Sequence, residues 1–259
     1  MKKAVFFDID GTLWNEKMQI PESTIEAVAA LRESGCYTFI CSGRSRSNIR
    51  SPKLLGIGFD GVVAACGAHI DFHGEKAFEQ LLEPHQVAHA LGIMEQHGMS
   101  VVLEGPKYTY VDDEAFPDDP YVIHLRKELG ADVKSIKDCK EFEINKMSAV
   151  LNGADFACVQ NDLGEGFDVI RHDEELVEII PKGHSKATGI QKVCELFDIA
   201  PENTYAFGDS ANDIEMLSFV AHGVAMGNAS EEAKQAAEFV TTDIMQDGIK
   251  RGLEHYGLI

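Results

Sequence analysis

The chain has 259 residues, of which 44% are apolar and 25% are charged, and it carries 23 Lys and Arg against 43 Asp and Glu, for a net charge of −20. These proportions are typical of a globular protein with a full apolar core and exclude a disordered or fibrous chain. The acidity, without a basic stripe, argues against nucleic acid and anionic membranes as partners. No apolar run reaches the roughly 18 residues of a membrane span. We therefore expect a soluble cytoplasmic protein.

The first predicted strand is the apolar run Ala4–Phe7, which leads directly into D-I-D-G-T at residues 8–12. A short, continuously apolar run is typical of a strand buried on both faces. Extended backbone points Asp8 and Asp10 in the same direction, and Gly11 lets the chain turn after them. A surface acidic loop rarely follows four apolar residues, so we interpret this pair as part of a functional site.

A helix and two further strands follow. Residues 23–26 read S-T-I-E, a capping box that predicts a helix from Ser23 to about Glu33, with Gly35 ending it. The apolar runs Tyr37–Cys41 and Gly61–Cys66 predict buried strands. This alternation of strand and helix is typical of a parallel α/β sheet.

From about Leu82 to Gly183 the pattern changes to helices interspersed with strands that look antiparallel, which indicates a separate α+β unit. We expect an inserted domain over residues 82–183, between the two segments of an α/β core, residues 1–81 and 184–259. The elements predicted in the insertion are a helix over Pro84–His97, strands over Ser100–Leu103 and Lys107–Val111, a helix ending near Leu129, a strand over Lys146–Leu151, a helix over Ala154–Asp162, and strands over Phe167–Arg171 and Leu176–Ile180.

The α/β alternation returns after the insertion, so the predicted fold class is α/β, with a Rossmann-like parallel sheet core. The elements predicted here are a helix over Ser185–Phe197, a strand over Thr204–Phe207, a helix from Asn212, a strand over Gly223–Met226, a helix from Ser230, a strand over Phe239–Thr241 and a helix ending near His255. In such sheets ligands bind beyond the carboxyl ends of the strands, where the chain places several polar clusters.

Lys186 is the most informative residue of these clusters. Ser185 is a good helix N-cap, so Lys186 falls in the first turn, where a cation opposes the helix dipole. An anion bound there would offset that cost, although an exposed lysine in a tolerant position is the plainer interpretation. Ser42 and the amide of Gly43, after the second strand, are weaker candidates for holding phosphate oxygens.

A second carboxylate pair, Asp209 and Asp213, lies in G-D-S-A-N-D at residues 208–213. Asp209 follows a predicted strand, and Asp213 starts a helix, where it could act as a cap, as a site residue, or as both. Hard oxygen ligands without Cys or His favour Mg²⁺ over zinc.

In order along the chain, D-x-D-G-T at 8–12, Ser42, Lys186 and G-D-x-x-N-D at 208–213 resemble the four motifs of the haloacid dehalogenase-like phosphohydrolase superfamily. The insertion resembles the larger α/β cap domain of that superfamily. The closest resemblance is to its Cof-type branch of sugar-phosphate phosphatases, because residues 223–229 and 247–249 are similar too. Cys66 departs from the branch, which typically has asparagine there.

The resemblance implies a role for each matching residue. Asp8 would be the nucleophile that forms an aspartyl-phosphate, and Asp10 would protonate the leaving oxygen and then deprotonate water. Mg²⁺ would be bound by Asp8, the backbone carbonyl of Asp10 and Asp209, with Asp213 in support. The phosphoryl oxygens would be held by Ser42, Gly43, Lys186 and Asn212.

We therefore expect a Mg²⁺-dependent phosphatase acting on a small phosphate monoester, such as a sugar phosphate or similar metabolite, with no obligate protein partner. A phosphomutase is the close alternative, and a non-catalytic phospho-acceptor switch is a more distant one. The switch has no need of Asp10, which argues against it. Two further residues stay open. Trp14 could line the site, pack or be exposed, and Arg44 could contact phosphate or the cap, or pair with a surface acid.

Overall fold

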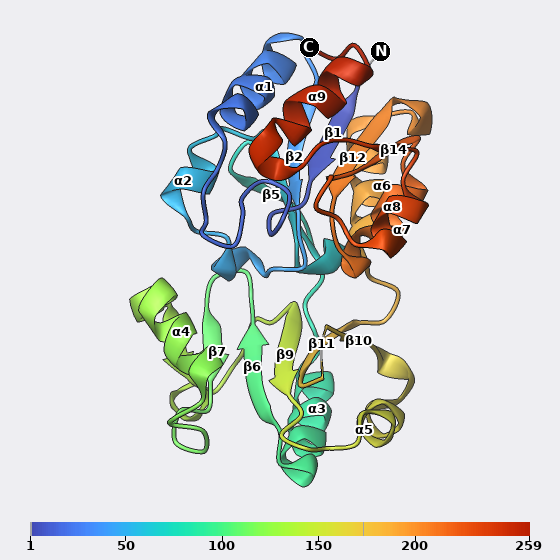
Figure 1. Ribbon diagram of the computed structural model, residues 1–259. Coiled ribbons are helices and arrows are strands. Elements are labelled where there is room, and N and C mark those ends of the chain that lie inside the picture. Colours follow the sequence, from blue (N-terminus) through green and yellow to red (C-terminus); the bar gives the residue numbers. More distant parts are fainter. Residues whose placement is uncertain (1, 173) are drawn as a thin grey trace. The chain divides into compact units, whose positions relative to one another are not determined.

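The computed structural model describes residues 2–172 and 174–259, and the chain divides into two compact units (Figure 1). Unit 1 comprises Met1–Gly43, Ser51–Phe78 and Ser185–Ile259, and unit 2 comprises Arg44–Arg50 and Glu79–His184. Within the described residues, no helix is both long enough and apolar enough to cross a membrane.

Unit 1 is built on an eight-stranded sheet with the apolar strand β1 near its centre. Strand β1 pairs in parallel with β12 on one side and with β2 on the other, and its four residues are completely buried. In sheet order the strands are β14 (Phe239–Val240), β13 (His222–Ala225), β12 (Thr204–Gly208), β1 (Ala4–Phe7), β2 (Tyr37–Cys41), β3 (Gly61–Ala64), β4 (His69–Phe72) and β5 (Glu75–Glu79). The strands from β14 to β3 are parallel, whereas β4 runs antiparallel to β3. The predicted α/β fold class is confirmed.

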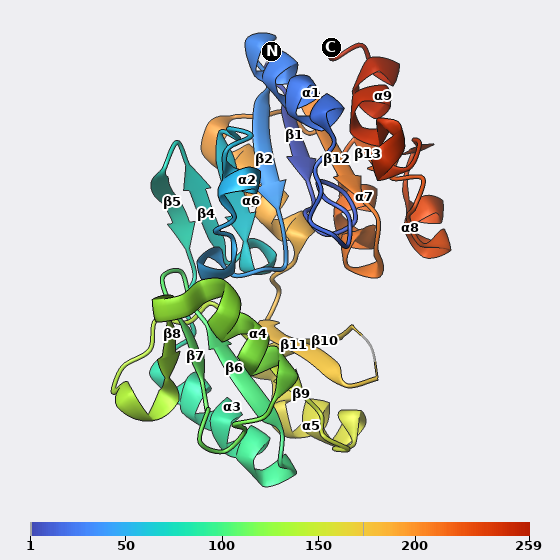
Figure 2. The ribbon, with the colours of Figure 1, turned by 60° about the vertical axis from the view of Figure 1, so that its left-hand side comes forward.

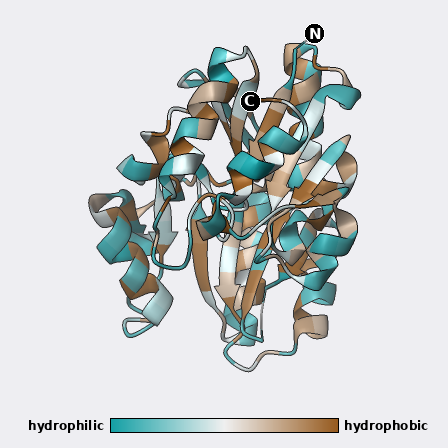
Figure 3. Ribbon diagram, turned by 45° about the horizontal axis from the view of Figure 1, so that its top comes forward, coloured by the Kyte–Doolittle hydropathy of each residue, from teal (hydrophilic) through white to brown (hydrophobic). Residues whose placement is uncertain are grey.

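Helices flank this sheet in packed pairs: α1 lies beside α9 (Figure 2), and α6 packs against α7. The helices of unit 1 are α1 (Glu22–Glu33), α2 (Pro52–Leu55), α6 (Lys186–Phe197), α7 (Ile214–Phe219), α8 (Glu231–Ala236) and α9 (Gly248–His255). Brown, hydrophobic colouring is concentrated on the strands, and the helices alternate between brown and teal (Figure 3). This is the pattern expected of a sheet buried under amphipathic helices.

The capping box predicted at Ser23 is wrong. Helix α1 begins one residue earlier, at Glu22, because Pro21 takes the N-cap position with extended backbone. Ser23 therefore lies inside the first turn, and among the described residues its hydroxyl has no hydrogen-bond partner. Gly35 follows the helix with φ +83°, as its predicted stop position requires.

The third strand is shorter than its apolar run predicts. β3 ends at Ala64 because Ala65, Cys66 and Gly67 all adopt left-handed backbone, with φ of 50°, 51° and 85°. The turn brings Gly67 against the start of α6, where a Cβ on Gly67 would lie 2.7 Å from the carbonyl oxygen of Ser185. Only glycine permits this approach, which packs the turn against the helix that carries Lys186.

Unit 2 has a six-stranded sheet covered by helices on both faces. Its strands, in sheet order, are β10 (Phe167–Arg171), β11 (Leu176–Pro181), β9 (Lys146–Val150), β6 (Ser100–Glu104), β7 (Thr109–Val111) and β8 (Val133–Ser135). Its helices are α3 (Pro84–His97), α4 (Pro120–Leu129) and α5 (Phe156–Leu163). Val101 and Leu103 of β6 pack in the core with α3 and α5, whereas Val102 packs with α4. The two-residue period of the strand separates these two apolar clusters.

Three strands were not predicted, β4, β5 and β8. Phe78 is the only large apolar side chain in β5, and β8 reads V-K-S, so neither shows a clear alternation of apolar and polar residues. Such strands form because neighbouring strands offer hydrogen bonds and not because their own sequence favours them.

Candidate active site

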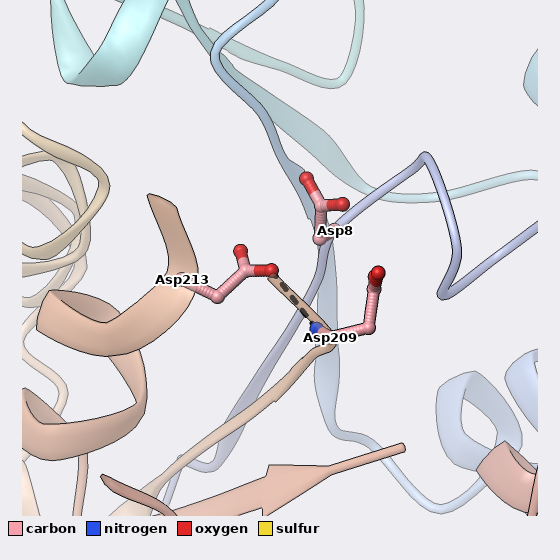
Figure 4. Close-up of side chains that lie close together, drawn as sticks. All are labelled: Asp8, Asp209 and Asp213. Carbon is pink, nitrogen blue, oxygen red and sulfur yellow. Dashed lines mark hydrogen bonds between the residues drawn. The ribbon is translucent and has the colours of Figure 1, made fainter. Parts of the chain in front are cut away.

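Three carboxylates, those of Asp8, Asp209 and Asp213, meet at the carboxyl end of the unit 1 sheet (Figure 4). Asp8 follows β1, Asp209 follows β12, and Asp213 precedes α7. Each offers an oxygen within 4.8 Å of the oxygens of the other two. Because β1 and β12 are parallel neighbours, with Phe7 opposite Phe207, residues far apart in the sequence leave the sheet side by side.

Lys186 joins two of these carboxylates. Its side chain is 1% exposed, and its ammonium donates to Oδ1 of Asp8 and Oδ1 of Asp213, both at 2.6 Å. A third bond reaches Oδ1 of Asn212 at 3.1 Å. Ser185 caps α6 by accepting the backbone N–H of Thr188, as predicted. The cation at this helix N-terminus is therefore stabilised by buried anions, and the alternative of an exposed lysine is excluded.

Asp209 is held by its neighbours in the first motif. The hydroxyl of Thr12 donates to Oδ1 of Asp209 at 2.7 Å. A Cβ on Gly11, whose φ is +87°, would lie only 2.2 Å from Oδ2 of Asp209. Gly11 therefore permits both the turn after Asp10 and the close approach of the second carboxylate.

Asp213 acts both as a cap and as a charge partner. Its Oδ2 accepts the backbone N–H groups of Asp209 and Ser210 at 2.9 and 3.0 Å, while its Oδ1 faces Lys186. The carboxylate is completely buried. With both oxygens bonded to protein donors, Asp213 fixes the turn that presents Asp209.

The electrostatics of this cluster suit a divalent cation. Burial raises the pKa of Asp8 to about 8, with Lys186 opposing and Asp213 adding to the rise. Burial also raises the pKa of Asp209 to about 6, against the hydrogen bond from Thr12. One ammonium thus balances only part of the charge of three carboxylates, and a cation such as Mg²⁺ would supply the rest. The donor set of the cluster, three carboxylates with no Cys or His among them, fits that ion.

Asp10 differs from the other carboxylates because it is exposed. It lines a cavity of about 630 Å³ together with Asp209 and Asn228. Its Oδ1 accepts a hydrogen bond from the indole N–H of Trp14 at 2.8 Å. An accessible carboxyl beside the buried cluster is well placed to exchange protons with a bound molecule.

The remaining predicted site residues, Ser42 and Gly43, lie at the carboxyl end of the neighbouring strand β2. Ser42 and Gly43 follow β2 and are buried, and the backbone N–H of Ser42 donates to Val63 in β3. The carbonyl of Ser42 accepts the N–H of Cys66, so the departure from the family pattern lies in direct contact with this turn. The structure brings Asp8, Lys186, Asn212 and Asp213 into one bonded cluster, with Ser42 and Gly43 on the strand beside it.

Sequence reasoning missed the supporting roles of Thr12 and Asn228 and left that of Trp14 open. The amide of Asn228 donates to the carbonyl of Gly11 at 2.8 Å, and its oxygen accepts the N–H of Ile244 at 3.0 Å. Asn228 thereby ties the turn of the first motif to the C-terminal part of the chain. The sequence feature that could have identified Asn228 is its position shortly after β13, at the same edge of the sheet as the other polar clusters.

Unit 2 contains a charged cavity of its own, of about 160 Å³. Lys146, whose side chain is 2% exposed, bonds Glu178 and lies 3.7 Å from Glu104. Asn48 donates to Oε2 of Glu104 at 2.8 Å. Arg44 lines the same cavity, and its Nη1 lies 3.9 Å from Oε1 of Glu128. Of the alternatives left open for Arg44, pairing with an acidic residue is therefore observed.

This network should make unit 2 sensitive to acid. Burial raises the pKa of Glu178, but Lys146 and His172 outweigh it and lower the pKa from 4.5 to about 2. A carboxyl with a lowered pKa in the folded state stabilises that state above its unfolded pKa. That stabilisation, on the order of 3 kcal/mol, is lost as the pH falls from about 5 towards 2.

We expect Glu178→Gln to flatten this acid dependence, with exposed Glu165→Gln as the matched control. The measurement is the free energy of unfolding at several pH values, obtained from urea titrations in which the NMR signals of β9 and β11 report the folded state. Parallel pH profiles for wild type and Glu178→Gln would show that the ion pair contributes nothing to the acid response.

Comparisons with known proteins agree with this geometry. Residues 5–253 match the family model of the haloacid dehalogenase-like hydrolases. The YkrA protein of Bacillus subtilis (strain 168) is 32% identical over 99% of this chain and 98% of its own length. Pyridoxal phosphate phosphatase YbhA of Escherichia coli (strain K12) is 28% identical over 95% of this chain and 96% of its own.

Among solved structures, that of the HAD subclass IIB sugar phosphatase BT4131 matches with a TM-score of 0.83 and 30% identity, over 99% of this chain and 100% of that one. Both the family match and the structural match run through the sheet end where the carboxylates meet and through the inserted unit. The chain therefore belongs to the haloacid dehalogenase-like hydrolases, in the Cof-type branch with a cap domain, and is a phosphoric monoester hydrolase.

Proposed function

We propose that the protein is a Mg²⁺-dependent phosphatase that hydrolyses a small phosphate monoester through an aspartyl-phosphate on Asp8. The observation that carries this proposal is the buried cluster at the sheet end, in which Lys186 orients Asp8 beside two further carboxylates. A nucleophile held by a fixed cation, next to oxygen ligands for a divalent ion, is the arrangement that phosphoryl transfer requires.

Asp8 is the attacking group. Because Lys186 bonds Oδ1, we assign the attack on phosphorus to Oδ2. The ammonium also opposes part of the rise that burial causes in the pKa of this carboxyl, and a bound cation would lower that pKa further. Lys186, Asn212, Ser42 and the amide of Gly43 would then hold the equatorial phosphoryl oxygens, where charge accumulates in the transition state.

The metal would be held by Asp8, the backbone carbonyl of Asp10 and Asp209, with Asp213 supporting Asp209 through the turn that it caps. When bound, Mg²⁺ neutralises the carboxylates and the phosphoryl oxygens. Thr12 and Gly11 keep the carboxylate of Asp209 in position for this role.

Asp10 moves the protons in both halves of the reaction. In the first, Oδ2 of Asp8 bonds to phosphorus, the bond from phosphorus to the ester oxygen breaks, and that oxygen takes the proton of Asp10. In the second, water attacks phosphorus, Asp10 takes a proton from the water, and the bond to Asp8 breaks to release phosphate. Each residue returns to its starting state.

The relatives and the site support a proposal for the substrate class. Two of the related proteins are a pyridoxal phosphate phosphatase and a sugar phosphatase. The cavity beside Asp10 has room for a small metabolite. We propose a sugar phosphate or a similar small ester as the substrate.

A panel of metabolite phosphates assayed with Mg²⁺ tests the proposal, with release of inorganic phosphate as the expected result. Conversion of one sugar phosphate into its isomer would instead identify a phosphomutase. A long-lived phosphoprotein with no turnover on any ester would identify the phospho-acceptor switch.

The metal site gives a prediction of its own. Thr12→Val removes the hydroxyl that orients Asp209 and changes little else in shape, so we expect Mg²⁺ affinity to fall by about 10–100-fold, as is usual for the partner of a metal ligand. Thr24→Val, a buried threonine in α1, is the matched control. Calorimetric titration with Mg²⁺, and activity against Mg²⁺ concentration, measure the effect. An unchanged Mg²⁺ dependence in Thr12→Val would show that the hydrogen bond from Thr12 does not orient a metal ligand.

A further inference from the structure

Trp14, the single tryptophan of the chain, lies against the exposed carboxyl of Asp10. The residue is 3% exposed, and its indole N–H donates to Oδ1 of Asp10 at 2.8 Å. The backbone joins Trp14 to the two residues that flank Asp10, because the N–H of Gly11 donates to the carbonyl of Trp14 at 2.9 Å and the N–H of Trp14 donates to the carbonyl of Ile9 at 3.2 Å. Both the side chain and the main chain therefore fix the indole relative to Asp10.

The chemistry of an indole makes this contact selective. Its N–H donates a hydrogen bond, never accepts one and does not titrate. When Asp10 is protonated, the oxygen that accepts the indole N–H is favoured as the carbonyl-type oxygen, so the proton sits on the other oxygen, Oδ2. A carboxyl that lacks such a donor can carry its proton on either oxygen.

We propose that Trp14 is a positioning residue that makes Oδ2 of Asp10 the oxygen through which protons pass. This rests on the acid and base role proposed for Asp10. The proton on Oδ2 goes to the ester oxygen as the bond from phosphorus to that oxygen breaks, and Oδ2 later takes a proton from the attacking water. Throughout, the indole holds Oδ1 and the orientation of the carboxyl plane.

Trp14 is also buried, so its replacement could slow the enzyme through lost packing alone. Packing and positioning differ in two ways. A loss of positioning affects esters that need a proton on the leaving oxygen, and it has no effect once Asp10 can no longer supply one. A loss of packing slows both kinds of ester equally, and it does so whether residue 10 is Asp or Asn.

The test is a double-mutant cycle of Trp14→Phe and Asp10→Asn, measured by single turnover with Mg²⁺ on an alkyl phosphate and on nitrophenyl phosphate. We expect Trp14→Phe to slow the alkyl ester by about 10-fold and the aryl ester much less. In the Asp10→Asn background, Trp14→Phe should change neither rate further. Leu31→Val, a core change in α1, controls for stability.

Equal losses on both esters, or an undiminished loss in the Asp10→Asn background, would overturn the proposal while leaving the acid role of Asp10 intact. An alkyl rate that Asp10→Asn leaves unchanged would overturn the acid role as well. The two failures are therefore distinguishable.

A second measurement stays informative if Trp14→Phe does not fold. One tryptophan gives a single indole N–H peak in a ¹⁵N–¹H spectrum. We expect Asp10→Ala to shift this peak and to speed its exchange with solvent, and Glu16→Ala, in the same cavity, to leave it in place. An indole peak whose chemical shift and exchange rate stay the same in Asp10→Ala would contradict the hydrogen bond on which the proposal depends.

Discussion

Replacing Asp8 with asparagine should reduce turnover to below about 1% of wild type while the fold stays intact. The amide has nearly the shape of the carboxyl but is a poor nucleophile, so no phosphorylated residue 8 can form. An asparagine at this position would still accept the hydrogen bond from Lys186 through its oxygen, and the charge that it removes from the cluster is one that burial disfavours. Initial rates on the best ester of a panel, with circular dichroism of the variant, measure both parts of this expectation.

The matched control for this prediction is Asp198→Asn, an exposed residue that ends α6 in left-handed backbone, a conformation that asparagine also tolerates. It should keep wild-type activity. Asp8→Asn with more than about one hundredth of wild-type activity, in a preparation free of contaminating phosphatase, would remove Asp8 from the role of nucleophile.

Asp10→Asn should slow alkyl phosphates by about 10²–10⁴-fold, the usual contribution of general acid–base catalysis. The aryl oxide of an aryl ester is a good leaving group that departs without a proton. The phosphorylation step of such esters should therefore slow much less. Hydrolysis of the aspartyl-phosphate should slow for both kinds of ester, because the water then lacks its base. Single-turnover measurements separate the two steps, and equal losses in phosphorylation for alkyl and aryl esters would argue against proton donation by Asp10.

The sequence predicted the convergence of the site because that convergence depends on topology alone. Asp8 and Asp209 each follow an apolar strand, and the strands are parallel neighbours, so no detail of packing was needed to bring them together. Lys186 was identified by the opposite signal, a cation where local helix electrostatics disfavour one. Its partners, Asp8 and Asp213, explain the placement.

The contacts that orient these residues could not be predicted. The bond from Thr12 to Asp209 joins positions 197 apart, and the bond from Asn228 to Gly11 joins positions 217 apart. Both bonds depend on the geometry of turns, which the pattern of apolar and polar residues does not encode. Trp14 could be interpreted in three ways from sequence, since a single aromatic residue after a turn has no periodicity to orient it.

Predictions from local sequence motifs failed where another residue took the position that the motif assigned. The capping box at Ser23 lost to Pro21, which fits the N-cap position and moves the helix start by one residue. In unit 2, the patterns around Glu104, Lys146 and Glu178 are those of ordinary strands. The burial of these three residues in one charged network depends on the register of three strands, which single-strand patterns do not encode.

The most direct test of the account is the identity of the residue that carries the phosphoryl group during turnover. Acid quench of the enzyme turning over an ester labelled in its phosphoryl group, followed by borohydride reduction of acyl phosphates and peptide mass spectrometry, locates that residue. We predict label in the enzyme during turnover that depends on Mg²⁺, with reduction at position 8 alone. Turnover without any labelled enzyme, or label on another residue, would contradict the assignment of Asp8 as the nucleophile.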